Sequence, residues 1–371
     1  MATQQHAEHV GSLLRPAWLL EARAAHKAGT RSAEELAELA DRAVLDAISL
    51  QQQAGIEVFT DGEMRRENWM AGLLECTGGV VSYDRPSVAW HRGGEIVSGP
   101  DTDFETVAAS EKVTRKEART SVEAAFLARH APRAFKITMM SASMGGLMWR
   151  PEISARVYPD PADLVADLVA LQIQEIEQLI DQGVRWVQLD SLGYNQVFDP
   201  GFRAQTGLSA LSPELILDAT VTADAQIVGA AKRKDPDVTV GMHICRGNNR
   251  SAWMAQGGYE QVAERLFGEV GADRFLLEYD TERAGGFEPL RFVRPGTTVV
   301  LGLISSKVPE LESQDELRRR IDQAARYVPV ADLALSPQCG FASTSRGNQL
   351  TSDDQRRKLE LVVSVAGKVW G

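Results

Sequence analysis

Residues 238–245 read VTVGMHIC, a short apolar stretch rich in β-branched residues that ends in a histidine and a cysteine. Such a stretch predicts a buried β-strand. Because residues two apart on a strand project to the same face, His243 and Cys245 can point in one direction from its carboxyl end. Similar stretches recur along the chain, so their order is informative about the fold.

Eight stretches of this kind end in small or polar residues, and amphipathic segments lie between most of them. The predicted strands are 8–12, 57–63, 135–143, 186–190, 238–245, 275–280, 298–306 and 333–340. The clearest helices are predicted over 32–55, 160–184 and 313–328. Repeated alternation of strand and helix predicts an α/β fold, a (β/α)₈ TIM barrel, as one domain over residues 1–371. A doubly wound open sheet is the alternative.

Two segments interrupt the alternation. Residues 76–112 are rich in glycine with short alternating runs, which predicts an antiparallel β insertion after the second strand. Residues 191–212 form a second long connection, after the fourth strand. Excursions at a barrel's mouth often carry function, so we expect substrate-specific contacts in both.

The composition is that of an ordinary globular protein, with 44% hydrophobic and 25% charged residues among 371. A formal net charge of −11 argues against nucleic acid as a partner, because polyanions need clustered basic residues. No stretch reaches the ~20 apolar residues of a membrane span, and the first residues lack a signal peptide's apolar region. We therefore expect no membrane partner and a cytoplasmic location. Three widely spaced cysteines make a poor disulfide framework. The oligomeric state is not readable.

Polar residues collect where the predicted strands end, which in a barrel is the mouth that holds the active site. These residues are Ser12, Asp61, Glu63, Ser141, Ser143, Asp190, His243, Cys245, Glu278, Asp280, Ser305, Ser306 and Cys339. Carboxylates and thiols are costly to bury unless they are paired or bound to metal, so this crowding indicates function.

One imidazole, two thiols and a carboxylate, from His243, Cys245, Cys339 and Glu278, can converge on the barrel axis and make a tetrahedral Zn²⁺ site. Taken singly, each residue has an ordinary alternative: a buried cysteine is usually a small apolar filler, and Glu278 could pair with a cation. Their placement at three strand ends favours the metal. Sulfur-rich zinc is a weak activator of water but can keep a bound substrate thiol as a thiolate. The set therefore favours alkylation of a thiol over hydrolysis.

With these residues in place, the chain resembles the catalytic barrel of cobalamin-independent methionine synthase, and more closely the single-barrel relatives that lack the amino-terminal half. The resemblance rests on HIC at 243–245, FLLEYD at 275–280 and LSPQCGFAS at 335–343, and it runs over essentially the whole length. It implies zinc as the cofactor, a homocysteine-like thiol as acceptor and a methyl donor such as methyltetrahydrofolate.

The resemblance also implies roles for three further residues. Ser12, in HVGS, would meet the carboxylate of the amino acid through its backbone. Glu63, in DGE, and Asp190, in VQLD, would hold its ammonium group and are the expected catalytic residues. Two carboxylates near a thiolate site suit a cationic amino group, although Asp61 or Glu63 could instead cap the following helix.

The chain departs from the methionine synthases at three places that bear on the substrate. Asp190 is followed by SLGYNQ instead of Glu-Pro, and the segment after the third strand reads SASMGGLMW, with Trp149 in place of an earlier tryptophan. Arg246 follows Cys245 directly and could bind an anionic group of a substrate, or form a salt bridge within the protein. The methyl donor is therefore left open.

Three other functions compete with methyl transfer to homocysteine. An enzyme similar to epoxyalkane:coenzyme M transferase would add a sulfonate-bearing thiol to another electrophile; Arg246 favours it, and Glu63 and Asp190 weigh against it. A relative of uroporphyrinogen decarboxylase would use the barrel without metal. A structural zinc would make the protein a binding module.

Overall fold

The computed structural model describes residues 5–83, 89–92, 95–97, 106–206 and 211–371. Its centre is a parallel sheet in the order β10-β9-β8-β7-β6-β5. The strands are β5 (Ile137–Met140), β6 (Trp186–Ser191), β7 (Thr239–Ile244), β8 (Arg274–Glu278), β9 (Thr298–Ile304) and β10 (Leu333–Pro337). Their residues are almost all buried, because helices cover the outside and neighbouring strands fill the inside.

The sheet order follows the chain order without reversal, which distinguishes a barrel from the doubly wound alternative. Two amino-terminal segments occupy the gap between β10 and β5. Single parallel bridges join Ala7 to Leu335 and Phe59 to Phe135. The two segments also contact each other, since Leu13 N donates to the Gly62 carbonyl at 3.0 Å. The predicted α/β barrel is confirmed.

The predicted strands 8–12 and 57–63 are wrong as regular strands. In the first, the carbonyls of residues 9 to 11 accept hydrogen bonds from side chains instead of from a neighbouring strand. The donors are Lys136 Nζ to His9, Gln188 Nε2 to Val10 and Thr60 Oγ1 to Gly11. In the second, Gly62 (φ +65°) and Glu63 (φ +58°) take left-handed backbone conformations, which extended strands exclude.

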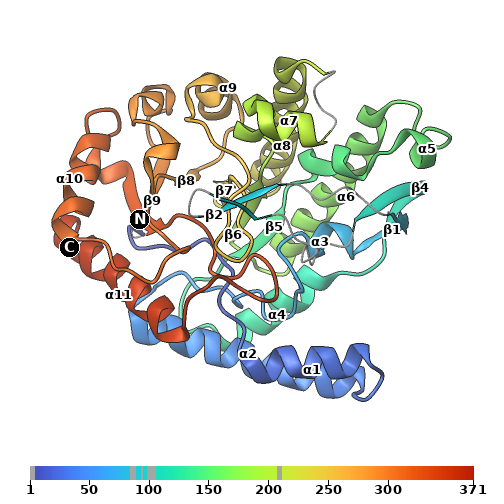
Figure 1. Ribbon diagram of the computed structural model, residues 1–371, viewed down its shortest axis with the longest axis horizontal. Helices are drawn as coiled ribbons and strands as arrows, with labels where there is room; N and C mark the ends of the chain where they lie inside the picture. The colour runs from blue at the N-terminus through green and yellow to red at the C-terminus, as the bar shows by residue number, and fades with distance from the viewer. Residues whose placement is uncertain (1–4, 84–88, 93–94, 98–105, 207–210) are drawn as a thin grey trace.

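Helices form the outer layer around the strands (Figure 1). They are α1 (Ala17–Lys27), α2 (Ala33–Ala54), α3 (Ala71–Leu74), α4 (Arg119–His130), α5 (Pro151–Ser154), α6 (Pro161–Asp181), α7 (Pro200–Thr206), α8 (Pro213–Lys234), α9 (Glu260–Glu269), α10 (Gln314–Ala324) and α11 (Ser352–Val369). Short 3₁₀ helices are η1 (Ala142–Met148), η2 (Asn195–Phe198), η4 (Glu282–Ala284), η5 (Glu288–Phe292) and η6 (Val330–Asp332).

The predicted helices 32–55, 160–184 and 313–328 correspond to α2, α6 and α10. The first of these is capped at its start by Ser32, which forms a capping box with Glu35, and at its end by Gly55 with φ +84°. In the described residues no helix has both the length and the apolar character needed to cross a membrane.

The segment after 57–63 carries two antiparallel pairs. Strand β1 (Thr77–Ser82) pairs with β4 (Val107–Arg115), and β2 (Trp90–Arg92) pairs with β3 (Glu95–Val97). The parts of 76–112 at 84–88, 93–94 and 98–105 lie outside the described residues, as do 207–210 of the second long connection. His91 in β2 bridges to Trp253, and the two rings stack at 4.4 Å. This contact brings the insertion onto the loop that follows β7.

Candidate metal centre

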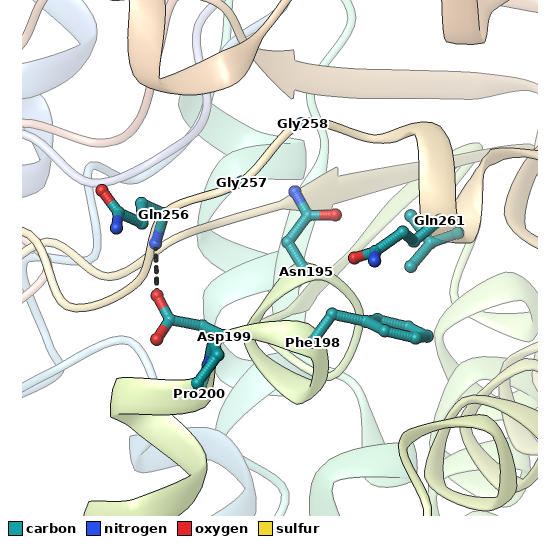
Figure 2. Close-up of a pocket in the computed structure, with 9 residues that line it drawn as sticks. Asn195, Phe198, Asp199, Pro200, Gln256, Gly257, Gly258 and Gln261 are labelled. Carbon is teal, nitrogen blue, oxygen red and sulfur yellow. Dashed lines mark hydrogen bonds between the residues drawn. The ribbon is translucent and has the colours of Figure 1, made fainter.

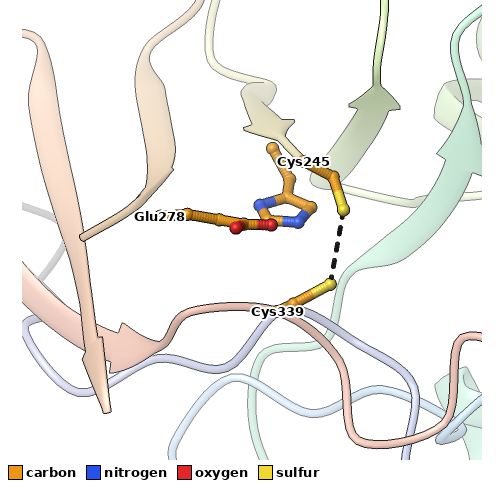
Figure 3. A group of neighbouring side chains, drawn as sticks. Cys245, Glu278 and Cys339 are labelled. Atoms are coloured by element: carbon orange, nitrogen blue, oxygen red, sulfur yellow. Dashed lines mark hydrogen bonds between the residues drawn. The ribbon is translucent and has the colours of Figure 1, made fainter. Parts of the chain in front are cut away.

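The structure brings the four predicted metal ligands together at the carboxyl ends of the strands (Figure 3). His243 lies in β7 and Cys245 just after it, Glu278 ends β8, and Cys339 follows β10. One ligand atom from each lies within 4.8 Å of the others, and the two sulfur atoms are 3.6 Å apart. All four side chains are buried.

Two buried atoms in this group have no hydrogen-bond partner within the part of the chain that the structure describes. His243 Nδ1 is 3.1 Å from the Leu276 carbonyl, which leaves Nε2 without a partner. Glu278 Oε1 accepts from the backbone N of Arg246 at 3.0 Å, which leaves Oε2 without one. An unsatisfied buried polar atom is destabilising, and a metal-binding histidine typically donates its other nitrogen to a carbonyl. With two free thiols beside them, these residues fit zinc.

The surroundings favour the anionic forms of Cys339 and Glu278, whereas the contact with Cys339 raises the pKa of the Cys245 thiol. The contact with Cys245 lowers the pKa of the Cys339 thiol below its ordinary value. Burial alone would raise the pKa of Glu278, but the charges of Lys307, Arg283 and Arg246 hold it below the ordinary value. Both groups are therefore readily deprotonated, as metal ligands must be.

Arg246 lies behind the metal group and is engaged by the protein itself. Its Nε donates to the Gly257 carbonyl and its Nη1 to the Glu278 carbonyl, both at 3.0 Å. The guanidinium also stacks on Tyr259 at 4.4 Å, and only 1% of the side chain is exposed. Of the two roles considered for Arg246, the geometry favours support of Glu278 within the protein over binding of a substrate anion.

A cavity of about 200 Å³ opens on the far side of Arg246, between η2 and the start of α9. Figure 2 shows its wall, where Gln256 N donates to Asp199 at 2.9 Å. Gly257, which holds Arg246, also lines it. None of the predicted site residues is among its lining residues, so this cavity is separate from the metal centre.

Glu63 lies in the irregular segment between α2 and α3, and one of its two carboxylate oxygens accepts a hydrogen bond. Its backbone N donates to Asp61 Oδ1 at 2.8 Å, and its Oε1 accepts from Thr138 Oγ1 at 3.0 Å. Its Oε2 is buried without a partner. The prediction that Glu63 caps a helix is not what the structure shows, since α3 begins only at Ala71.

Asp190 is the penultimate residue of β6 and pairs in register with His243 on β7. Its Oδ1 accepts from Gln188 Nε2 at 2.7 Å. Burial raises the pKa of Asp190 to about 7; the charge of Glu63 adds to the rise, and His243 opposes it. The effect of Glu63 on Asp190 indicates that the two carboxylates lie near each other, and a cation bound between them would offset the repulsion.

Ser12 lies against the loop that carries Cys339. Its carbonyl accepts from Phe341 N at 2.9 Å, and its Oγ accepts from Ala342 N at 3.4 Å. A Cβ on Gly340 would come within 2.0 Å of Ser12 Oγ, so a side chain at this position would force the Ser12 hydroxyl to move. The structure thus places Ser12 beside the metal centre.

Two features of the site were missed from the sequence. Lys307 is 8% exposed, and its Nζ has no hydrogen-bond partner among the described residues. It comes one residue after the predicted strand 298–306, so extending that predicted strand by one residue would have included it. The second feature is an apolar wall around the two thiols. It consists of Met140, Met144, Leu192, Trp69, Met70, Leu73, Leu147 and Met254. No local motif marks these residues, because they come from distant segments.

Comparison with known proteins places these residues in a family context. The family described as "Cobalamin-independent synthase, Catalytic domain" matches residues 151–368, which include the four candidate ligands and Asp190. The uncharacterized protein YxjH of Bacillus subtilis is 38% identical over 98% of this chain and 94% of its own length.

Two further relatives carry a functional name. A methionine synthase of Saccharolobus solfataricus is 25% identical over 91% of this chain and 88% of its own. The structure of a putative vitamin-B12 independent methionine synthase from Listeria monocytogenes is 28% identical. It covers 99% of this chain and 98% of its own, with a TM-score of 0.73. The similarity therefore extends over the amino-terminal segments that carry Ser12 and Glu63.

Proposed function

This chain belongs to the cobalamin-independent methionine synthase family, and from that premise we propose that it is a zinc-dependent thiol alkyltransferase. The reaction is transfer of a methyl group to homocysteine or a related thiol, which forms a thioether. Family membership supports a methyltransferase, and the residues of the site support the finer assignment.

The observation that carries the proposal is the donor set of His243, Cys245, Glu278 and Cys339, with ligand atoms within 4.8 Å of one another. These residues would hold zinc, which when bound keeps a substrate thiol deprotonated and nucleophilic. Nε2 of His243 and Oε2 of Glu278, which form no hydrogen bond within the described residues, support the same assignment. Glu278 also has a protein donor in Arg246 N, so its carboxylate stays partnered if the substrate sulfur displaces it.

The chain's other residues bind and orient the substrate. Glu63 and Asp190 each have one oxygen anchored and hold the ammonium group of the amino acid with the other. The backbone at Ser12, beside Cys339, meets its carboxylate. The apolar wall excludes water from the thiolate and accommodates the methyl group, which favours attack on carbon.

The donor is the least constrained part of the reaction. The apolar wall suits the methyl group of a folate, a corrinoid, an aryl methyl ether or another small electrophile. A panel of such donors, each combined with several thiols and scored by the mass of the thioether product, tests the proposal. Product from homocysteine or a close analogue supports it, and the absence of a thioether with every pair contradicts it.

The contacts of Arg246 argue against the sulfonate-bearing acceptor. Its Nε and Nη1 already donate to protein carbonyls, whereas Glu63 presents a free carboxylate oxygen. A metal-free decarboxylase is distinguished by zinc analysis of the purified protein, since the proposal predicts about one zinc per chain. We also propose a cytoplasmic location, because two thiols 3.6 Å apart stay reduced and able to bind metal in that compartment.

A further inference from the structure

A buried ion pair lies directly behind Glu63. Arg66 donates from Nε to Glu123 Oε1 at 2.9 Å and from Nη2 to Glu123 Oε2 at 2.5 Å. Each residue is 1% exposed, and Glu123 comes from α4 on the outside of the barrel. Packed apolar residues often stabilise a fold as well as a buried ion pair does, so stability alone does not account for this one.

On its other side, Arg66 contacts Thr138, which in turn contacts the carboxylate of Glu63. Arg66 Nη1 is 3.2 Å from Thr138 Oγ1 and donates to it, and Nη2 donates to the Thr138 carbonyl at 2.7 Å. Because the hydroxyl oxygen accepts from Arg66, its own hydrogen is free to point to Glu63 Oε1, 3.0 Å away. Arg66 Nη1 itself lies 3.7 Å from that oxygen. Oε1 is thereby fixed, and Oε2 is the oxygen that remains open.

The backbone of Glu63 is held in an unusual conformation by the same neighbourhood. Its φ of +58° lies in the left-handed region, which residues with a Cβ rarely adopt. Arg15 Nη2 donates to the Glu63 carbonyl at 2.9 Å and to the Arg66 carbonyl at the same distance. Strained conformations persist where surrounding contacts determine them, and they concentrate at functional sites.

We propose that Arg66, held by Glu123, is a positioning residue that orients the free oxygen of Glu63 and so makes the site select thiols that carry an α-ammonium group. The inference rests on the proposed function, because it presumes that a thiol binds at the metal centre. Neither Arg66 nor Glu123 needs to touch the ligand, since both act through Thr138 and Glu63.

The test compares two thiols that differ only in the amino group, homocysteine and 4-mercaptobutanoate. Each is titrated into the cobalt-loaded protein, and the thiolate-to-cobalt charge-transfer band gives a dissociation constant without any methyl donor. The main variant is Arg66→Met combined with Glu123→Leu, which removes both members of the Arg66–Glu123 pair together. Arg66→Lys keeps the cation but loses the bidentate pairing. Lys358→Met, which breaks a buried pair with Glu312 in the outer layer, is the matched control.

We expect the unmodified protein and Lys358→Met to prefer homocysteine. In the double variant, affinity for homocysteine should fall roughly tenfold or more, as for a lost hydrogen bond to a charged group, while affinity for 4-mercaptobutanoate changes less than about twofold. Arg66→Lys should show an intermediate preference, and it carries the test if the double variant fails to fold.

An equal loss for both thiols, or an unchanged preference in both Arg66 variants, would overturn the positioning role while leaving thiol binding intact. A different failure would be seen if neither thiol produced the band in the unmodified protein. That result would remove the proposed function, and the positioning role with it.

Discussion

The two sides of the barrel mouth are built in different ways. The metal side takes its ligands from the ends of regular strands, where β7, β8 and β10 place His243, Cys245, Glu278 and Cys339. The carboxylate side depends on an irregular segment, in which Glu63 has a left-handed backbone and is held by side chains from distant elements. At a strand end, the local sequence determines which way a side chain points. The position of Glu63 depends instead on contacts with distant elements, which form only when the whole barrel is folded.

The largest effect should come from the metal side. We expect Cys339→Ser to abolish detectable methyl transfer and to lower zinc content, because a thiolate ligand is lost while the barrel core is unchanged. Zinc analysis, activity and circular dichroism measure the three properties. Cys76→Ser, at a buried cysteine outside the site, is the control and should retain activity. Unfolding of Cys339→Ser would indicate instead that the metal is structural.

On the carboxylate side, Asp61 should lower the free energy of unfolding by an amount that depends on pH. Burial and the charge of Glu123 raise the pKa of Asp61 to about 7. Between its ordinary pKa and pH 7, the folded state keeps a proton that the unfolded state loses, so this group lowers the free energy of unfolding as pH rises. We expect Asp61→Asn to gain on the order of a few kcal/mol relative to the unmodified protein between pH 4 and pH 8. Urea denaturation at several pH values measures it, and a gain that does not grow with pH contradicts it.

Substrate binding should separate the two sides most clearly. Glu63→Gln should weaken homocysteine binding roughly 10- to 100-fold, as for loss of a hydrogen bond to a charged group, and should leave zinc content unchanged. Isothermal titration and metal analysis provide the two readings. Glu21→Gln, at an exposed carboxylate of α1, serves as the control. Loss of zinc from Glu63→Gln would mean that the two sides are not independent.

The smallest effect should come from Arg246, which supports the metal side without being a ligand. Arg246→Lys keeps the backbone N that donates to the Glu278 carboxylate. It loses the guanidinium that donates to the carbonyls of Gly257 and Glu278. We expect zinc affinity to fall about tenfold, as for other residues that orient ligands, with little change in the preference among thiols. Competition with a chelator gives the affinity. A changed preference for anionic thiols would restore the substrate-binding role expected from the sequence.

The two sides also differ in how far the sequence could predict them. The barrel and the four-ligand group follow from local patterns, because strand ends and the two-residue spacing of His243 and Cys245 determine direction. The first predicted strand was wrong because distant side chains such as Lys136 and Gln188 donate to its carbonyls, and the second because Gly62 and Glu63 have left-handed backbones. Arg246 looked available for a substrate because nothing local reveals Gly257 and Glu278 as its acceptors.

The central claim is that His243, Cys245, Glu278 and Cys339 hold a zinc ion at which a substrate thiol binds. X-ray absorption at the zinc edge, on the zinc-loaded protein with and without homocysteine, tests it most directly. We expect two sulfur neighbours without homocysteine and a third Zn–S contact at about 2.3 Å when homocysteine is added. A protein that binds no zinc, or a zinc environment that homocysteine leaves unchanged at saturation, would contradict it.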